Sequence, residues 1–222
     1  MKSVTFKMVL GLLICSTLLV ACKREEEIID GNAKFRLVNA FQGSQSQDFY
    51  QGDTKISTTA IAYGEASDYL TVKAGASTVA FKSANTQDVS ASGSIGINND
   101  ISYTVFYAKN STGVGEITGY PETNTAPPAG KAGVRFVNLG AALTSAVLVS
   151  FSTGEPITNS LGFGNITGYA VLDPTAELKF SLLGSVNSAI IPAATFQGGK
   201  LYTVWFDAAN TTTAQYHVVA QN

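Results

Sequence analysis

The amino-acid sequence predicts an all-β protein made of two tandem antiparallel β-sandwich modules, immunoglobulin-like in the broad sense. Three observations support this fold class. Short stretches alternate apolar and polar residues, as in residues 178–182, and turn-forming residues separate the stretches. The chain repeats one pattern of such stretches, from residue 33 and again from residue 132. After residue 22 no helical pattern is evident, and many short strands at regular spacing indicate about seven strands in each sandwich.

The N-terminal segment predicts export and a lipid anchor. A short basic start precedes an apolar run from Met8 to Val20, which is too short to span a bilayer, because a membrane-spanning helix needs about 20 apolar residues. The run has the length of the apolar region of a secretory signal peptide. It leads into Leu-Val-Ala-Cys at residues 19–22, which resembles a lipoprotein signal. The resemblance implies a lipoprotein signal peptide at residues 1–21 and acylation of Cys22.

The expected acylated tether, residues 22–32, carries a charge run. Residues 23–27 read Lys-Arg-Glu-Glu-Glu, and such a run is usually a solvated spacer. The run also resembles the acidic export signals that follow the acylated cysteine in some Gram-negative surface lipoproteins. We expect a protein that is lipid-anchored to the outer membrane through Cys22 and exposed at the cell surface, with a periplasm-facing orientation as the open alternative. Cys15 lies in the predicted signal peptide, so the mature chain has no thiol left for a disulfide.

The body of the chain divides into two similar modules. Three sequence blocks recur in the same order, with residues 33–39, 61–69 and 103–107 matching residues 132–138, 161–169 and 202–206. The nearly constant spacing predicts β-sandwich modules at residues 33–120 and 132–222. Residues 121–131 lie between them and contain three prolines, a composition typical of a semi-stiff linker.

The repeat blocks also carry a family resemblance. Residues 36–40 (Arg-Leu-Val-Asn-Ala), 48–52 (Asp-Phe-Tyr-Gln-Gly), 63–69 and 103–105 (Tyr-Thr-Val) resemble the domain-of-unknown-function family numbered 4397. The resemblance implies tandem sandwich modules in a bacterial envelope lipoprotein with no assigned activity. The second module departs from the family pattern, since Val-Leu-Val-Ser-Phe at residues 147–151 replaces the element at 48–52. Both copies lack the family's usual proline after the opening strand.

Composition argues against several classes of function. Of the 222 residues, 45% are hydrophobic and 14% are charged, with a net charge of −2. The chain can therefore bury large cores, and it has no basic cluster for a nucleic-acid partner. His217 is the only histidine, and we expect it at the surface or on an edge strand near the C-terminus. A Ser-His-carboxylate site assembled in space stays open, although no Gly-x-Ser-x-Gly motif supports it. We expect no enzyme activity, no cofactor and no metal site.

Four aspartates are candidates for other chemistry: Asp48, Asp53, Asp68 and Asp100. A pair of carboxylates about 5–10 Å apart can hydrolyse glycosides. Calcium binding is the other possibility, but no Asp-x-Asp-x-Asp run supports it. These aspartates fall at predicted turns or strand ends, where the side chain commonly accepts hydrogen bonds from local backbone N–H groups. We expect this local capping role for them.

Aromatic residues recur at equivalent positions: Tyr63, Tyr69, Tyr103, Phe106 and Tyr107 match Phe163, Tyr169, Tyr202, Trp205 and Phe206. A shared core predicts such recurrence, and an exposed ring platform for sugars is the alternative. Trp205 points to the opposite face of its strand from Tyr202 and Phe206. We therefore single it out as a candidate ligand-binding residue, with a contact between the modules as the alternative. Arg36 and Arg135 also recur, and we expect each to pair with a carboxylate across its sheet.

These observations predict a non-enzymatic cell-envelope lipoprotein whose tandem sandwiches serve as a structural, adhesive or ligand-presenting module. The expected partners are the membrane, through acylated Cys22, and a glycan or another envelope protein. The first alternative is a glycan-binding accessory lipoprotein for a surface uptake system, and the second is an envelope hydrolase.

Overall fold

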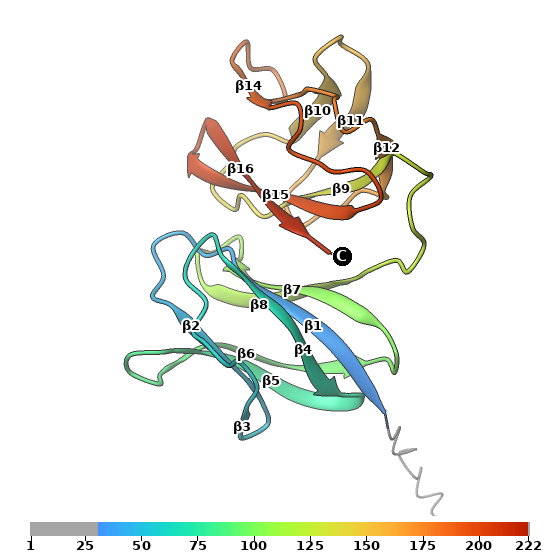
Figure 1. The fold of residues 1–222 in the computed structure, drawn as a ribbon. Coiled ribbons are helices and arrows are strands. Elements are labelled where there is room, and N and C mark those ends of the chain that lie inside the picture. Colours follow the sequence, from blue (N-terminus) through green and yellow to red (C-terminus); the bar gives the residue numbers. More distant parts are fainter. Residues whose placement is uncertain (1–30, 222) are drawn as a thin grey trace, which may run out of the picture.

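The computed structural model describes residues 31–221, which fold into four β-sheets stacked as layers (Figure 1). These residues form sixteen strands, and this part of the chain contains no helix. It follows that residues 31–221 hold no helical segment that is long and apolar enough to cross a membrane. The prediction of an all-β fold with sandwich modules is confirmed.

The first module contains two sheets. Its inner sheet, which faces the second module, has the strand order β4-β1-β7-β8. These strands are β1 (Asn32–Asn39), β4 (Ala66–Lys73), β7 (Ser102–Lys109) and β8 (Gly115–Pro121). Its outer sheet has the order β3-β2-β5-β6. These strands are β2 (Gln47–Gln51), β3 (Thr54–Lys55), β5 (Gly75–Ser83) and β6 (Val89–Ile97).

The second module repeats this arrangement strand by strand. Its inner sheet has the order β12-β9-β15-β16 and its outer sheet the order β11-β10-β13-β14. The inner strands are β9 (Ala132–Asn138), β12 (Ala170–Leu172), β15 (Leu201–Asn210) and β16 (Thr213–Ala220). The outer strands are β10 (Val147–Phe151), β11 (Pro156–Leu161), β13 (Leu178–Leu182) and β14 (Ser188–Ile191). Each module has eight strands where the sequence predicted about seven, because a strand as short as β3 carries no alternating pattern.

One strand pair in each inner sheet is parallel. β1 runs parallel to β7, with Phe35 beside Tyr103, and β9 runs parallel to β15, with Val134 beside Tyr202. The other strand pairs among the described residues are antiparallel, as predicted. The parallel pairs arise because β7 and β15 enter the inner sheet from an outer strand and not through a hairpin.

Each sandwich has its own apolar core. In the first module, Phe35 of β1 reaches across to Phe49 of the outer sheet, with ring centroids 5.9 Å apart, and Phe49 contacts Phe81 at 5.1 Å. In the second module, Phe180 of the outer sheet contacts Phe206 of β15 at 5.1 Å. Burying each such ring contributes about 1.5–3 kcal/mol, so the alternating strands account for both cores.

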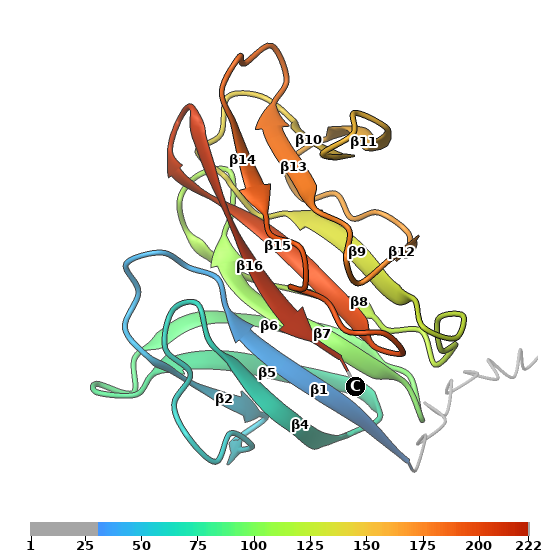
Figure 2. The same ribbon diagram turned by 45° about the horizontal axis from the view of Figure 1, so that its top comes forward.

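A third apolar cluster lies between the two inner sheets. Its buried members are Val38, Ala40, Phe106, Ala108, Val137, Leu139, Trp205 and Val219. Because each inner sheet is apolar on both faces, every residue of β9 and the first seven residues of β15 are buried. Figure 2 shows the two inner sheets lying face to face, with an outer sheet on either side.

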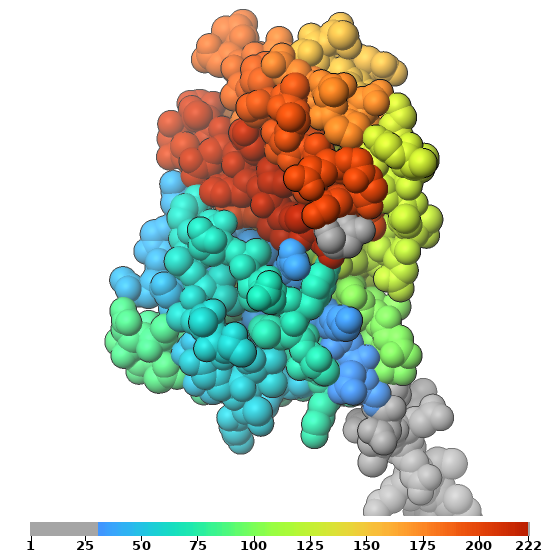
Figure 3. All heavy atoms as spheres, in the orientation of Figure 1, coloured from blue at the N-terminus to red at the C-terminus, as the bar shows by residue number. Residues whose placement is uncertain are grey.

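The two modules are stacked through the faces of their inner sheets. β1 begins at an edge of the inner sheet, at the lower right in Figure 1, whereas β14 lies at the top of the second module. Residues 122–131 connect β8 to β9 and run along one side of the stack, where they are yellow-green in Figure 3. The space-filling view shows the two modules in continuous contact along their boundary on this face of the molecule (Figure 3).

Candidate functional site

The predicted lipid attachment site lies outside the described residues. The described residues begin at residue 31, so the signal peptide at residues 1–21, acylation of Cys22 and most of the tether stay predictions.

Trp205 lies at the centre of the contact between the modules. Its side chain is 0% exposed, and it stacks on the His217 ring with centroids 3.8 Å apart and an interplanar angle of 6°. From the first module, Phe106 and Tyr63 meet the indole edge-on at 6.3 and 6.4 Å. The prediction of Trp205 as an exposed ligand-binding ring is therefore wrong, because the sheet face that carries it is covered by the first module. The alternative, a contact between the modules, is what the structure shows.

Most of the other recurring aromatic rings are also covered. Phe106, Tyr107, Tyr202 and Phe206 are buried, which agrees with the shared-core interpretation. Phe163 is the one member of the set that is exposed, at 38%. A sugar-stacking platform needs a pair of exposed coplanar rings, and this set does not supply one within residues 31–221.

One end of the interface holds a polar cluster around Asp207. Tyr63 of the first module donates its hydroxyl hydrogen bond to Asp207 Oδ2, and Gln215 Nε2 donates to the Tyr63 hydroxyl oxygen at 2.9 Å. His217 Nε2 lies 3.6 Å from Asp207 Oδ1. Burial first, and then the hydrogen bond to Asp207, raise the pKa of Tyr63. Tyr63 therefore stays a neutral donor that ties the first module to the second.

This cluster is not a nucleophilic triad. His217 has a carboxylate neighbour in Asp207, but the nearby hydroxyl belongs to Tyr63, whose hydrogen is donated to Asp207. His217 lies on the edge strand β16 near the C-terminus, as expected, and is partly buried against Trp205. Within residues 31–221, no group of three or more His, Cys, Asp or Glu side chains is placed to hold a metal ion.

The other end of the interface is organised by two arginines. Arg135 is buried and donates from Nη1 to the Pro121 carbonyl oxygen at 2.6 Å and from Nε to Thr203 Oγ1 at 2.9 Å. Arg36 donates from Nη1 to the carbonyl oxygen of Ala220. The expected carboxylate pairing across the sheet is not formed by either arginine among the described residues. Burial lowers the pKa of Arg135.

Both arginines also stack on tyrosine rings. The guanidinium carbon of Arg36 lies 4.3 Å from the centroid of Tyr69, and that of Arg135 lies 5.1 Å from the centroid of Tyr169. Cation–π contacts of this kind contribute about 0.5–2 kcal/mol, with the larger values at desolvated sites. Burial is the main reason that the pKa of Tyr69 and that of Tyr169 are raised.

The two arginine contacts are related by a pseudo-twofold axis. Arg135 is the repeat counterpart of Arg36, and Ala220 is the counterpart of Pro121, so each arginine reaches the same carbonyl of the opposite module. On the axis, Phe106 contacts its own counterpart, Trp205. Each module thus uses the same face, as the two subunits of a symmetric dimer do.

The hydroxyl groups beside the arginines are satisfied within one network. Gln221 Nε2 donates to Thr104 Oγ1 at 3.2 Å and to Thr203 Oγ1 at 3.0 Å, and Thr104 donates to Glu122 Oε1 at 2.6 Å. Tyr69 also donates to Glu122. Shared hydrogen bonds of this kind favour one relative position of the groups that carry them, although the buried Nε of Arg36 has no hydrogen-bond partner among the described residues.

The four candidate aspartates have different surroundings. Asp48 is buried in β2 and forms an ion pair with Lys55 Nζ at 2.8 Å, while Ser57 donates a long hydrogen bond to it at 3.5 Å. Asp53, Asp68 and Asp100 lie on the exposed or partly exposed surface of the first module. Asp53 and Asp100 lie in turns, as expected, whereas Asp48 and Asp68 lie within β2 and β4. The ion pair of Asp48 was not foreseen.

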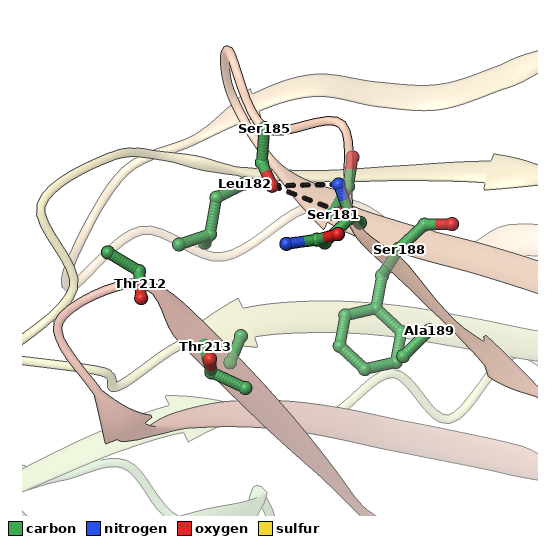
Figure 4. Close-up of a pocket in the computed structure, with 10 residues that line it drawn as sticks. Ser181, Leu182, Ser185, Ser188, Ala189, Thr212 and Thr213 are labelled. Carbon is green, nitrogen blue, oxygen red and sulfur yellow. Dashed lines mark hydrogen bonds between the residues drawn. The ribbon is translucent and has the colours of Figure 1, made fainter.

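Hollows of about 540 and 480 Å³ lie on the first module, beside β4 and the start of β1. Two smaller hollows adjoin the second module. A groove of about 240 Å³ lies beside the interface network and is lined by polar side chains, including Lys34, Glu122, Asn124 and Gln221. A smaller hollow of about 110 Å³ lies at the far end of the second module, between the β13–β14 hairpin and the β15–β16 turn (Figure 4). Sequence analysis singled out neither hollow, because each is formed by residues far apart in the chain.

The chain was compared with known proteins. No curated protein matches the sequence. Among solved structures, the crystal structure of CBMbc (family CBM26) from Eubacterium rectale Amy13K in complex with maltoheptaose covers 86% of this chain and 97% of its own, at 7% sequence identity and a TM-score of 0.27. A TM-score this low supports no inference about what this chain binds. The model of a family described as a domain of unknown function, DUF4397, matches residues 33–150, more than half of the chain, and the chain therefore belongs to the DUF4397 family.

Proposed function

We propose that this chain is a non-enzymatic, lipid-anchored protein of the cell envelope whose two sandwiches act as one rigid unit. The unit holds the second module away from the membrane and presents it to a partner. The observation that carries this proposal is the interface between the two inner sheets.

The interface has the features of a core and not of a mobile domain contact. Interfaces between domains of one chain are usually polar, and relative motion is the default expectation. Here a fully buried apolar cluster around Trp205 and Phe106 lies at the centre. Hydrogen bonds between the modules flank it on both sides, at Tyr63 on one side and at Arg36 and Arg135 on the other. These contacts support a fixed arrangement of the two modules.

The direction of the stack supports the presenting role. The predicted tether joins β1, which begins at the lower right in Figure 1, whereas β14 lies at the top of the second module. A tether of residues 22–32 spans at most about 35 Å when extended. An anchor at Cys22 would therefore hold the first module near the membrane and place β14 at the distal end.

Two experiments test the proposal. Replacing Cys22 with serine should move the protein from the membrane fraction to the soluble fraction, and unchanged sedimentation with membranes would contradict the anchor. The rigid unit is tested on residues 23–222, which contain no cysteine, with spin labels at D53C and N187C. One narrow distance distribution is expected, and a broad one would contradict rigidity.

Glycan binding is a second candidate function. The polar groove beside Glu122 and Asn124 favours it, together with an adjoining groove of about 480 Å³ that shares Lys34 and Asn124, because amides, hydroxyls and carboxylates bind sugar hydroxyl groups. Calorimetric titration with envelope glycans should then give binding that Asn124→Ala weakens. The absence of heat with every glycan would leave the presenting role as the function.

A further inference from the structure

The two modules differ at the edge where the last strand of the outer sheet, β6 or β14, lies beside the last strand of the inner sheet, β8 or β16. The two sheets are in close contact at this edge in the first module (closed) and are separated by a hollow in the second (open). β6 runs from Val89 to Ile97 and pairs with β5 along its length, whereas its counterpart β14 has only the four residues Ser188–Ile191. Pro192 follows β14 directly, and Pro174 stands where the first module has Gly75. Proline has no backbone N–H and cannot donate to a strand ladder, so the β13–β14 hairpin ends early.

The two sheets of the first module contact each other at this edge because Gly115 has no side chain. A Cβ built on Gly115 of β8 would lie 2.8 Å from the Ser90 carbonyl oxygen and 2.6 Å from the Tyr107 ring. The counterparts of Gly115 and Ser90 in the second module are Ala214 and Ala189. A methyl group at Ala214 does not permit the same approach, and the hollow of about 110 Å³ lies where the first module is closed.

The hollow has an apolar floor and an uncharged polar rim. Phe180, Leu182, Ala189 and Ala214 contribute apolar surface, and hydroxyl and amide groups surround them. In Figure 4, Thr212 and Thr213 of the β15–β16 turn face Ser185 and Leu182 of the β13–β14 hairpin across the opening. No charged side chain lines the hollow, so a charged group placed in it would be desolvated without a partner.

The hairpin beside the hollow exposes large apolar side chains. Val186 is 98% exposed, Leu183 is 54% exposed and Ile190 is 41% exposed. Residues 180–199 contain no Asp, Glu, Lys or Arg. Scattered single apolar residues on a surface need no explanation, but a group of them beside an apolar hollow is typical of an interaction site.

β14 also offers an unpaired strand edge. It pairs with β13 on one side only, and Ser188, Ala189 and Ile190 are exposed. Native edge strands are commonly protected by being very short or by charged residues, proline or a bulge. β14 is short and is followed by Pro192, but its own four residues carry no charge and no proline. An extended peptide can add to such an edge through backbone hydrogen bonds, while a neighbouring pocket selects one of its side chains.

We propose that the distal end of the second module binds an extended, uncharged segment of another protein, which adds as a strand to β14 and places one aliphatic side chain in the hollow. The inference rests on the proposed function and names its partner class. The hollow's volume of about 110 Å³ is well below the roughly 300 Å³ at which small-molecule sites begin, so a single side chain fits it and a sugar ring does not. The lack of charge on both hollow and edge selects an uncharged segment.

The test uses the full chain in detergent micelles and a phage-displayed library of random ten-residue peptides. Selection should yield uncharged peptides with an aliphatic residue at a constant position. For the tightest peptide, Ile190→Lys and the hollow-filling Ala214→Leu should each raise the dissociation constant at least tenfold in fluorescence anisotropy. Val114→Lys, at an exposed apolar position of the first module, is the matched control and should change it less than twofold.

Several outcomes would overturn the proposal: no selected peptide, charged peptides, peptides whose affinity neither variant changes, or a dimer of this chain that Ile190→Lys abolishes. Because Ile190 is at the surface, its variant keeps the test valid if Ala214→Leu does not fold. Failure here is separable from failure of the proposed function, since membrane anchoring by Cys22 and the distance distribution between the modules do not involve β14.

Discussion

The two modules have the same strand order, but their outer surfaces differ in the number of charged residues and in whether the outer edge is closed. The first module carries charged residues along most of its strands and closes its outer edge through Gly115. The second module has few charged residues: apart from Arg135, they are Glu155, Asp173, Glu177, Lys179, Lys200 and Asp207. Its outer edge is short and open. The inner faces, in contrast, still match well enough to form a pseudo-twofold interface. The need to form this interface therefore restricts the residues of the inner sheets, whereas the residues of the outer sheets can differ between the modules.

The largest expected effect lies where the two inner faces meet. Trp205→Ala removes the largest fully buried side chain and leaves a cavity against Phe106, so the free energy of unfolding should fall by about 3–5 kcal/mol. Urea unfolding followed by circular dichroism measures this loss. Phe106→Ala, the counterpart across the axis, should cost a similar amount. The exposed control Val186→Ala should stay within about 0.5 kcal/mol of the wild type. A loss below about 1 kcal/mol at Trp205 would mean that the contact does not stabilise the fold.

The two arginines should differ in spite of their symmetric roles. Arg135→Ala leaves the Pro121 carbonyl and the Thr203 hydroxyl without their donor in a buried site, which should cost about 1–3 kcal/mol of unfolding free energy. Arg36 is only partly buried, so Arg36→Ala should cost less, because water can reach the freed carbonyl. Denaturant unfolding of both variants gives the order, and a larger loss for Arg36 would contradict the difference in burial.

The glycine that closes the first module can be exchanged with its counterpart. Gly115→Ala should lower the unfolding free energy by about 1–3 kcal/mol, because the Ser90 carbonyl oxygen cannot move away freely. Ala214→Gly should cost only about 0.5–1 kcal/mol, from the added freedom of the unfolded chain. Thermal unfolding of both variants compares them. Equal losses would show that the closed edge does not depend on Gly115.

The smallest effect is confined to alkaline pH. The pKa of Tyr63 and that of Tyr69 are raised in the folded protein, chiefly by burial and then by their carboxylate partners. Above about pH 10, the ordinary tyrosine pKa, the unfolded chain loses these protons and the folded chain keeps them. Stability should therefore be unaffected by these groups at neutral pH and fall as the pH rises above 10. Urea unfolding at pH 8 and pH 11 should show a smaller drop for Tyr63→Phe, and an unchanged drop would remove Tyr63 as a cause.

Much of the architecture was predictable because the alternation of apolar residues has a direct structural meaning. Phe35 and Leu37 point inward as their period of two requires, and the repeat blocks locate matching strands. The parallel pairing of β1 with β7 was not predictable, since the alternation contains no information about strand direction. The continuous burial of β9 has only a partial sequence signal, because Arg135 interrupts the apolar residues that are typical of a strand covered on both faces.

The site was predictable only in part. The opposite orientation of Trp205 and Phe206 on one strand pointed to a second apolar face, but a face that covers another module and a face that binds a sugar have the same pattern. The partners of Arg135 could not be deduced, because Pro121 and Thr203 approach it only after the modules stack. The hollow beside β14 depends on Ala214 and Pro192, whose meaning emerges only from comparison with the first module.

The pseudo-twofold axis between Phe106 and Trp205 has a consequence for any shortened form of the chain. A fragment that ends after β8 would expose the face of the first module's inner sheet. The apolar centre and flanking arginine of this face contact a near copy of the same face in the full chain. Such a half-molecule would be drawn to a second half-molecule in solution. Covalent continuity between the halves thus replaces a concentration-dependent association with one that is permanent.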